Sequence, residues 1–313
     1  MKLSLIIPIA ESDVGALLNN LSYIKENIIC DKIFVIGQGT LRHRFENKNV
    51  TFIDEDTLYP GLTFNKVREI IYKINPKAVR RTGWYFQQFL KLAFALKLDG
   101  GYYLTWDSDT IPLKKIDFFN NSGIPFLDCR PYVVEDEPYF QTIENIWKDG
   151  NVKKKDYNSY ISEHMVFSSN IVKEMINEIE CKEDIAGNLF YEKILNSIPV
   201  TELNLSGFSE FETYASYLIC KHTGEFELRR WKNLRHGKVY FGANPTAVQF
   251  EWASKTYDVV SIEDFDKQWL ICKFLCNKKE ISKRSFSEVS NFVEPKIAFI
   301  YKWRLKIREL VRR

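Results

Sequence analysis

The sequence predicts an α/β protein with a mostly parallel central sheet, helices on its faces and a helical extension at the C-terminus. Three observations support this fold class. Short apolar runs alternate with segments of helical periodicity through the first hundred residues, the rhythm of β-α-β units. The 313 residues are enough to bury a large core without disulfide bonds. The 45% hydrophobic and 27% charged fractions are those of a globular protein rather than a disordered or fibrous one.

The elements of the first half follow from their patterns in chain order. Apolar runs of four to seven residues bounded by polar or glycine-containing loops predict buried strands, and apolar residues spaced three or four apart predict helices. The predicted strands are residues 3–9, 32–36, 50–53 and 102–106, and the predicted helices are residues 14–29, 64–74 and 84–98. Helices between consecutive strands favour parallel pairing.

The second half is less regular. Its patterns predict strands at residues 126–127, 131–134 and 161–167, helices at 170–179, 209–220, 247–257 and 264–274, and a strand or loop at 239–242. We expect one domain over residues 1–260, with halves at residues 1–115 and 116–260. A helical extension is expected over residues 261–313.

Charge and cysteine usage narrow the possible binding partners and the cellular compartment. The formal net charge is +3, but residues 296–313 carry +6, so the remainder is slightly acidic. An acidic body without a known nucleic-acid motif makes nucleic acid a poor partner. The six cysteines are scattered without the paired spacing of a zinc site, which favours a reducing compartment. With no signal peptide and no membrane span in the pattern, a cytoplasmic protein is expected.

Asp107 and Asp109 are the sharpest feature of the sequence. They follow the predicted strand 102–106 directly and flank Ser108. In open α/β sheets, ligands bind just beyond the carboxyl ends of strands. Two carboxylates placed there can share one hard divalent cation that leaves coordination sites for phosphate. An ordinary acidic loop is the alternative.

Residues 103–112 resemble the metal-binding segment of nucleotide-sugar glycosyltransferases of the GT-A type. Three further stretches, at residues 83–91, 163–167 and 208–214, resemble the DUF6492 type of bacterial and viral polysaccharide glycosyltransferases. The resemblance covers about residues 1–245 and implies a Rossmann-like GT-A fold, with a nucleotide-binding half at residues 1–115 and an acceptor-binding half at 116–260. It also implies a nucleotide-sugar donor and a glycan or lipid-linked acceptor, as in capsule or lipopolysaccharide synthesis.

The resemblance implies roles for individual residues. Asp107 and Asp109 would hold Mn²⁺ or Mg²⁺ and, through it, the donor diphosphate. His236 is the candidate third ligand, with a surface histidine as the equal alternative. Pro8, at the end of the first strand, would approach the nucleotide through its backbone.

His164 and Tyr214 lie in the matching stretches. The resemblance makes them candidate contacts to the acceptor. For His164, a core or surface histidine is the alternative.

An inverting transfer needs a general base for the acceptor hydroxyl, and Glu210 and Glu212 are the candidates. Ser209 and Glu212 fit a capping box, in which Glu212 folds back onto the helix start. That leaves Glu210 as the expected base. The helix dipole favours its ionised form, whereas burial against Phe208 and Phe211 would raise its pKa.

Gln88 and Lys91 share one helix face with Trp84, because the three are spaced i, i+4 and i+7. They are candidate donor contacts, with Lys91 as a point charge on phosphate. Arg81, just before this helix, is a further candidate. A solvated helix face is the alternative for each of them.

Residues 296–313 predict a basic amphipathic helix with an apolar stripe of Ile297, Ile300, Ile307, Leu310 and Val311. This pattern suits an anionic membrane surface, so we expect a peripheral protein on the inner face of the plasma membrane. A helix that packs on the body or on a protein partner is the alternative.

Two rival functions remain open. A nucleotidyltransferase acting on sugar phosphates shares the sheet, nucleotide and metal, but usually has a glycine-rich basic loop after the first strand, which residues 8–13 lack. A non-catalytic membrane adaptor with a glycosyltransferase-like fold would keep its function without Asp107 and Asp109.

Overall fold

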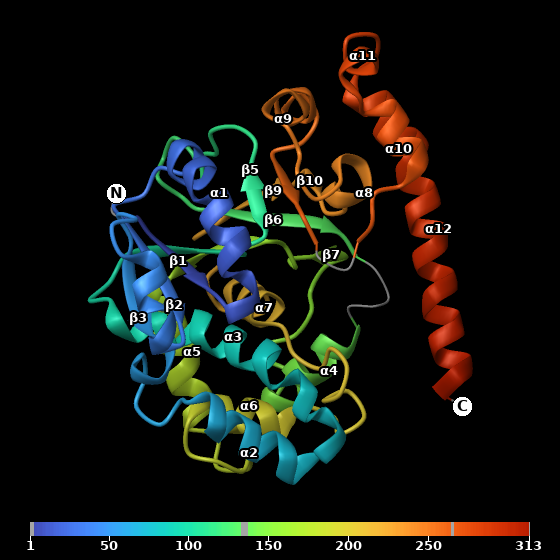
Figure 1. Ribbon diagram of the computed structural model, residues 1–313. Coiled ribbons are helices and arrows are strands. Elements are labelled where there is room, and N and C mark those ends of the chain that lie inside the picture. Colours follow the sequence, from blue (N-terminus) through green and yellow to red (C-terminus); the bar gives the residue numbers. More distant parts are fainter. Residues whose placement is uncertain (1–2, 133–136, 264–265, 313) are drawn as a thin grey trace. The chain divides into compact units, whose positions relative to one another are not determined.

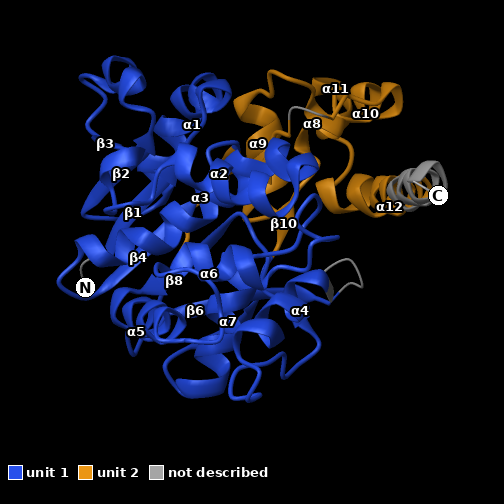
Figure 2. Ribbon diagram, turned by 90° about the horizontal axis from the view of Figure 1, so that it is seen from below, with its two compact units in different colours: residues 1–109, 117–231 blue, residues 110–116, 232–313 orange. Residues whose placement is uncertain are grey.

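The computed structural model describes residues 3–132, 137–263 and 266–312. The chain forms two compact units. The first unit comprises residues 1–109 and 117–231, and the second unit comprises residues 110–116 and 232–313 (Figure 2). The expected domain ranges, 1–260 and 261–313, stay a prediction.

A five-stranded sheet forms the centre of the first unit, with strand order β3-β2-β1-β4-β8. The first four strands of this order are parallel and β8 is antiparallel to β4. The fold class is therefore a mixed α/β fold with a mostly parallel central sheet, as the sequence predicts. The strands are β1 (Leu3–Pro8), β2 (Lys32–Gly37), β3 (Thr51–Asp54), β4 (Tyr102–Trp106) and β8 (His164–Ser168).

Helices flank this sheet, and most match the predicted periodicity. The predicted helix at 84–98 is divided into α3 and a 3₁₀ turn at Phe94–Lys97. Two helices, α4 and α6, were not predicted. The helices of this unit are α1 (Val14–Asn27), α2 (Phe64–Ile74), α3 (Thr82–Ala93), α4 (Glu137–Ile146), α5 (Ser169–Glu180), α6 (Phe190–Ser197) and α7 (Glu210–Lys221).

The order of the strands creates a switch point between β1 and β4. The chain runs from β1 outward to β2 and β3 and then returns to β4 on the other side of β1 (Figure 2). Right-handed crossovers therefore put α1 on one face of the sheet and α2 and α3 on the other. Ligands of such sheets bind at the switch point, beyond the carboxyl ends of the strands.

A small sheet completes the first unit. In it β6 (Phe126–Pro131) pairs with β7 (Asn158–Ser159) and with β9 (Glu227–Arg230). One continuous strand thus replaces the two predicted at 126–127 and 131–134, and residues 133–134 lie outside the described residues.

The second unit has a three-stranded sheet of order β10-β11-β5. Its strands are β5 (Thr110–Pro112), β10 (Asn233–Leu234) and β11 (Val259–Ser261). Phe286 lies at the centre of its aromatic core, where its ring packs against Tyr240, Phe241 and Trp252. The helices are α8 (Gly237–Phe241), α9 (Ala247–Ser254), α10 (Leu270–Leu275), α11 (Lys278–Ile281) and α12 (Phe286–Arg312).

Three predictions for this unit differ from the structure. Residues 239–241 form the end of α8 and Gly242 follows it, whereas a strand or loop was expected, because a short apolar run has no periodicity that separates helix from strand. The helix predicted at 264–274 begins only at Leu270. The last helix begins at Phe286, ten residues before its predicted start, and continues through Pro295.

No helix within the described part of the chain is long and apolar enough to span a bilayer.

Candidate functional site

The loop that follows β4 is fixed at the switch point by two hydrogen bonds. The Asp107 N–H donates to the carbonyl of Glu163 over 2.9 Å, which ties the loop to the segment before β8. The Asn20 side chain on α1 donates to the carbonyl of Ser108 over 2.9 Å. The Asp107–Asp109 segment is therefore held both by the residues before β8 and by α1.

Asn20 was missed in the sequence, although a signal was present. It is buried on the apolar face of α1, between Leu17 and Ile24. A polar side chain at a core position of an amphipathic helix needs a hydrogen-bond partner, and here that partner is the candidate metal-binding loop.

An ionic cluster joins three of the predicted site residues. The Lys91 Nζ lies 3.0 Å from Asp107 Oδ1 and 2.9 Å from Glu210 Oε1. Lys91 and Glu210 are almost fully buried, whereas the Asp107 side chain is 32% exposed. We call these three residues the acidic cluster. It opens to solvent through Asp107.

Two helices position the acidic cluster. Gln88 and Lys91 both come from α3, and Glu210 begins α7. The Gln88 Oε1 accepts a hydrogen bond from the Glu210 N–H over 3.1 Å. The Lys91 Nζ also lies 4.4 Å from the ring centroid of Phe211, close enough for a cation–π contact. Gln88 and Lys91 thus face the interior, not the solvated helix face that was the alternative.

One lysine between two carboxylates leaves this buried cluster with an excess negative charge. Burial raises the pKa of Glu210, the nearby Asp107 adds to the effect, and Lys91 opposes it. Burial alone would lower the pKa of Lys91, but Asp107 and Glu210 raise it above its ordinary value. Lys91 therefore stays charged, and Glu210 is a stronger base than an exposed glutamate.

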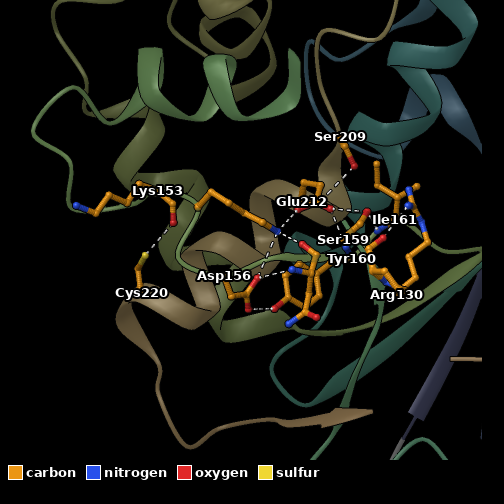
Figure 3. A network of polar contacts seen from close by, with 12 residues as sticks. Arg130, Lys153, Asp156, Ser159, Tyr160, Ile161, Ser209, Glu212 and Cys220 are labelled. Carbon is orange, nitrogen blue, oxygen red and sulfur yellow. Dashed lines mark hydrogen bonds and ion pairs between the residues drawn. The ribbon is translucent and has the colours of Figure 1, made fainter. Parts of the chain in front are cut away.

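Glu212 belongs to a different network, which Figure 3 shows. Its carboxylate accepts hydrogen bonds from Ser159 Oγ over 3.0 Å and from the Tyr160 N–H over 2.7 Å, and it lies 3.3 Å from Lys154 Nζ. Ser209 caps α7 through the Glu212 N–H, as predicted. The Glu212 carboxylate, which was expected to fold back onto the helix start, instead binds the segment around β7.

His164 is fully buried. Its Nε2 lies 2.9 Å from Asp128 Oδ2, and Asp128 is also bound by the Arg229 guanidinium over 2.6 and 2.8 Å. The rings of Trp106 and Trp231 pack around the imidazole. The environment is that of a satisfied core histidine, so the acceptor contact stays a prediction.

Tyr214 is also buried. Its hydroxyl accepts a hydrogen bond from the Ser168 N–H over 2.9 Å, and its ring packs on Phe167. An acceptor contact through Tyr214 likewise stays a prediction.

Pro8 and Arg81 lie in different surroundings. Pro8 ends β1, two residues beyond the Ile6–Thr105 pair, and so lies at the same sheet edge as Asp107. The Arg81 guanidinium stacks 4.0 Å from the ring centroid of Trp84. Burial lowers the pKa of Arg81. Their predicted donor contacts stay predictions.

The proposed metal ligands are divided between the two units. Asp107 and Asp109 belong to the first unit and are half-buried. His236 belongs to the second unit, where its Nδ1 lies 2.9 Å from Asp266 Oδ2. Within the described ranges, no three His, Cys, Asp or Glu side chains gather closely enough to hold a metal ion. The role of His236 as a third ligand stays a prediction.

A cavity of about 480 Å³ lies elsewhere, at the amino ends of β2 and β3. Its lining includes Lys25, Asp31, Lys32 and Thr51. Because ligands of parallel sheets bind at the carboxyl ends of strands, we assign the candidate site to the acidic cluster and not to this cavity.

The fold and the acidic cluster define an α/β protein with a carboxylate-rich site at the switch point of its sheet. A model described as a family of unknown function (DUF6492) matches residues 25–237, and the chain belongs to this family.

No curated protein matches the chain. Among solved structures, 141 chains match. One is the apo structure of the bifunctional glycosyltransferase WbbM, at 12% identity and a TM-score of 0.41. The match covers 85% of this chain and 46% of that one, so the chain spans less than half of the length of WbbM.

Proposed function

We propose that this chain is a glycosyltransferase. It moves a sugar from a nucleotide-sugar donor to a saccharide or lipid-linked glycan acceptor in the synthesis of a surface polysaccharide, with inversion at the anomeric carbon. The observation that supports this most directly is the acidic cluster. It combines a partly exposed carboxylate, Asp107, with a buried glutamate of raised pKa, Glu210, at the switch point of the sheet.

The position of the acidic cluster suits a nucleotide diphosphate. Beyond the carboxyl ends of β1 and β4, the donor would lie over Pro8 and the Asp107–Asp109 loop. Lys91 carries a positive charge at the floor of this site. That charge reduces the repulsion between the phosphates and the carboxylates around them.

The residues present fit a hard divalent cation. Mg²⁺ and Mn²⁺ are commonly held by one or two carboxylates together with substrate phosphates, so Asp107 and Asp109 suffice without a third protein ligand. Such a cation supplies Lewis-acid stabilisation of the charge that develops on the departing diphosphate. Lys91 holds in place the Asp107 carboxylate that would bind the cation.

Glu210 takes the proton of the acceptor hydroxyl in this proposal. A base works best when its pKa approaches the working pH, and burial shifts the pKa of Glu210 in that direction. Lys91 holds the carboxylate in place through the 2.9 Å contact to Oε1. Gln88 fixes the start of α7 from which Glu210 projects.

The test uses a panel of nucleoside diphosphate sugars with Mn²⁺ and a mixture of mono- and disaccharide acceptors. We expect release of nucleoside diphosphate from at least one donor, and its loss in Asp107→Asn. Release of pyrophosphate from a nucleoside triphosphate and a sugar phosphate would instead identify a nucleotidyltransferase. Turnover of the same donor by Asp107→Asn at the wild-type rate would contradict the proposal.

A further inference from the structure

The two units differ sharply in charge. The second unit contains 19 Lys and Arg residues against nine Asp and Glu, whereas the first unit contains 25 against 32. Their formal charges are therefore +10 and −7. Residues 296–313 supply +6 of this +10, as the sequence pattern indicates, and the other 71 residues of the second unit add +4.

Most of the exposed large apolar side chains also belong to the second unit. Among the described residues it has eight of them, in 89 residues, whereas the first unit has five in 224. Seven of the eight lie between residues 270 and 303. They are Leu270, Ile271, Phe274, Phe292, Phe299, Ile300 and Trp303. Exposed apolar groups concentrated in this way mark an interaction surface.

The helix α12 has one packed face. Phe286, Val289, Val293 and Ile297 recur at three- or four-residue spacing and are buried in the second unit. A hydrogen bond of 2.9 Å from the Tyr240 hydroxyl to Glu294 fixes the same half of the helix. Ile297, which the sequence placed in the membrane-facing stripe, is therefore a core residue, and that assignment was wrong.

A second stripe of α12 is exposed. Phe292, Phe299 and Trp303 are spaced i, i+7 and i+11, so they lie on one line along the helix, away from the buried line. We call these three residues the aromatic stripe. The Lys296 Nζ lies 3.4 Å from the ring centroid of Phe292, beside the stripe. Figure 1 shows α12 (red) extending well beyond α8.

We infer that the second unit docks on an anionic bilayer surface through the aromatic stripe of α12. Aromatic rings favour the interface between lipid headgroups and acyl chains, and basic residues beside them bind lipid phosphates. The +10 charge of the unit complements such a surface. It opposes the rival occupant, a second copy of the same unit, because two strongly basic surfaces repel each other.

The inference does not depend on sugar transfer, since vesicle binding needs no donor. The full chain is mixed with sucrose-loaded vesicles of phosphatidylcholine alone or with 30% phosphatidylglycerol, and bound protein is measured by sedimentation. We expect at least tenfold stronger binding to the anionic vesicles. The double variant Phe299→Ser/Trp303→Ser should lose at least tenfold of that binding while keeping the wild-type melting temperature, because both side chains are exposed.

The matched control removes two apolar groups of the acidic unit that are even more exposed than Phe299 and Trp303. Ile29 and Tyr157 are 75% and 90% exposed, and Ile29→Ser/Tyr157→Ser should bind vesicles as the wild type does.

Three results would overturn the inference. The first is wild-type vesicle binding by the aromatic-stripe variant, and the second is equal binding to neutral and anionic vesicles. The third is an absence of vesicle binding, combined with a wild-type dimer in light scattering that the aromatic-stripe variant converts to a monomer. That result would show that the aromatic stripe binds a second copy of the chain.

Discussion

Glu210 and Glu212 lie two residues apart in the first turn of α7, yet their carboxylates enter two different networks. Glu210 joins the acidic cluster at the switch point, and Glu212 joins the hydrogen-bond network around β7. In each network one lysine lies between two carboxylates: Lys91 in the first and Lys154 in the second. The separation arises because side chains at i and i+2 of a helix point about 200° apart.

The two networks differ in how fully hydrogen bonds and positive charges stabilise the ionised carboxylates. Burial would raise the pKa of Asp156, the partner of Glu212 at Lys154, but hydrogen bonds from Tyr160 and Asn158 lower it. For Glu210, burial prevails over Lys91 and the pKa rises. A satisfied network stabilises a fold, whereas a carboxyl of raised pKa beside a ligand position is typical of a functional site.

The largest expected effect is at Asp107. Asp107→Asn removes the charge that holds the donor cation, and it should slow sugar transfer by about 1000-fold, or about 4 kcal/mol. Asp99→Asn, an exposed position at the amino end of β4, is the matched control and should keep wild-type activity. Rates are measured by release of nucleoside diphosphate. An equal loss of activity in both variants would contradict the assignment of Asp107 to the site.

Glu210→Gln should lower the transfer rate by about 100-fold or more, the usual contribution of a general base. Its free energy of unfolding should change by less than about 1 kcal/mol, because the charged form is already disfavoured by burial. Urea unfolding and the pH profile of the rate are measured together. A variant that keeps the acidic limb of the wild-type profile would show that another group is the base.

Glu212→Gln should give the reverse pattern. The variant leaves Lys154 without one of its carboxylates and should lose about 2 kcal/mol of folding free energy. Its transfer rate, corrected for the folded fraction, should stay within about threefold of the wild type. If Glu212→Gln abolishes transfer while its stability is unchanged, the roles assigned to the two glutamates are exchanged.

Local patterns were enough to predict the central sheet and the position of individual residues along it. The four parallel strands of the central sheet and the helices between them match the predicted ranges closely, because a β-α-β pattern depends on residues that are contiguous in the sequence. Asp107 was predicted for the same reason: it directly follows β4.

Contacts between distant segments were not predictable in the same way. Lys91 was expected to contact a donor phosphate, and nothing in the sequence indicated that it joins Asp107 to Glu210. The capping pattern at Ser209 predicted the cap itself, but the partners of the Glu212 side chain come from the β7 segment. Short elements such as α6 and α8 carry too few residues to show a period.

A smaller effect is expected at Glu55, a buried carboxyl at the end of β3. Like Glu210, it has a raised pKa, but it lies outside the acidic cluster. Burial, with Asp56 and Asp54 nearby, raises the pKa of Glu55 from 4.5 to about 7. Its stabilising contribution is therefore complete below pH 4.5 and is lost as the pH rises through 7.

Glu55→Gln should consequently melt about 3 °C higher than the wild type at pH 8 and at the same temperature at pH 5. Thermal unfolding at the two pH values measures this. An equal difference at both would mean that the ionisation of Glu55 is not the cause.

Nucleotide-dependent thermal stabilisation tests the central claim most directly. The wild type, Asp107→Asn and Asp109→Asn are melted with uridine, guanosine and thymidine diphosphates, with and without Mn²⁺. A ligand that binds the folded state raises the melting temperature by mass action. The account predicts a rise for at least one diphosphate that requires Mn²⁺ and is absent from both variants. A rise of the same size in the wild type and both variants, or no rise with any diphosphate, would contradict it.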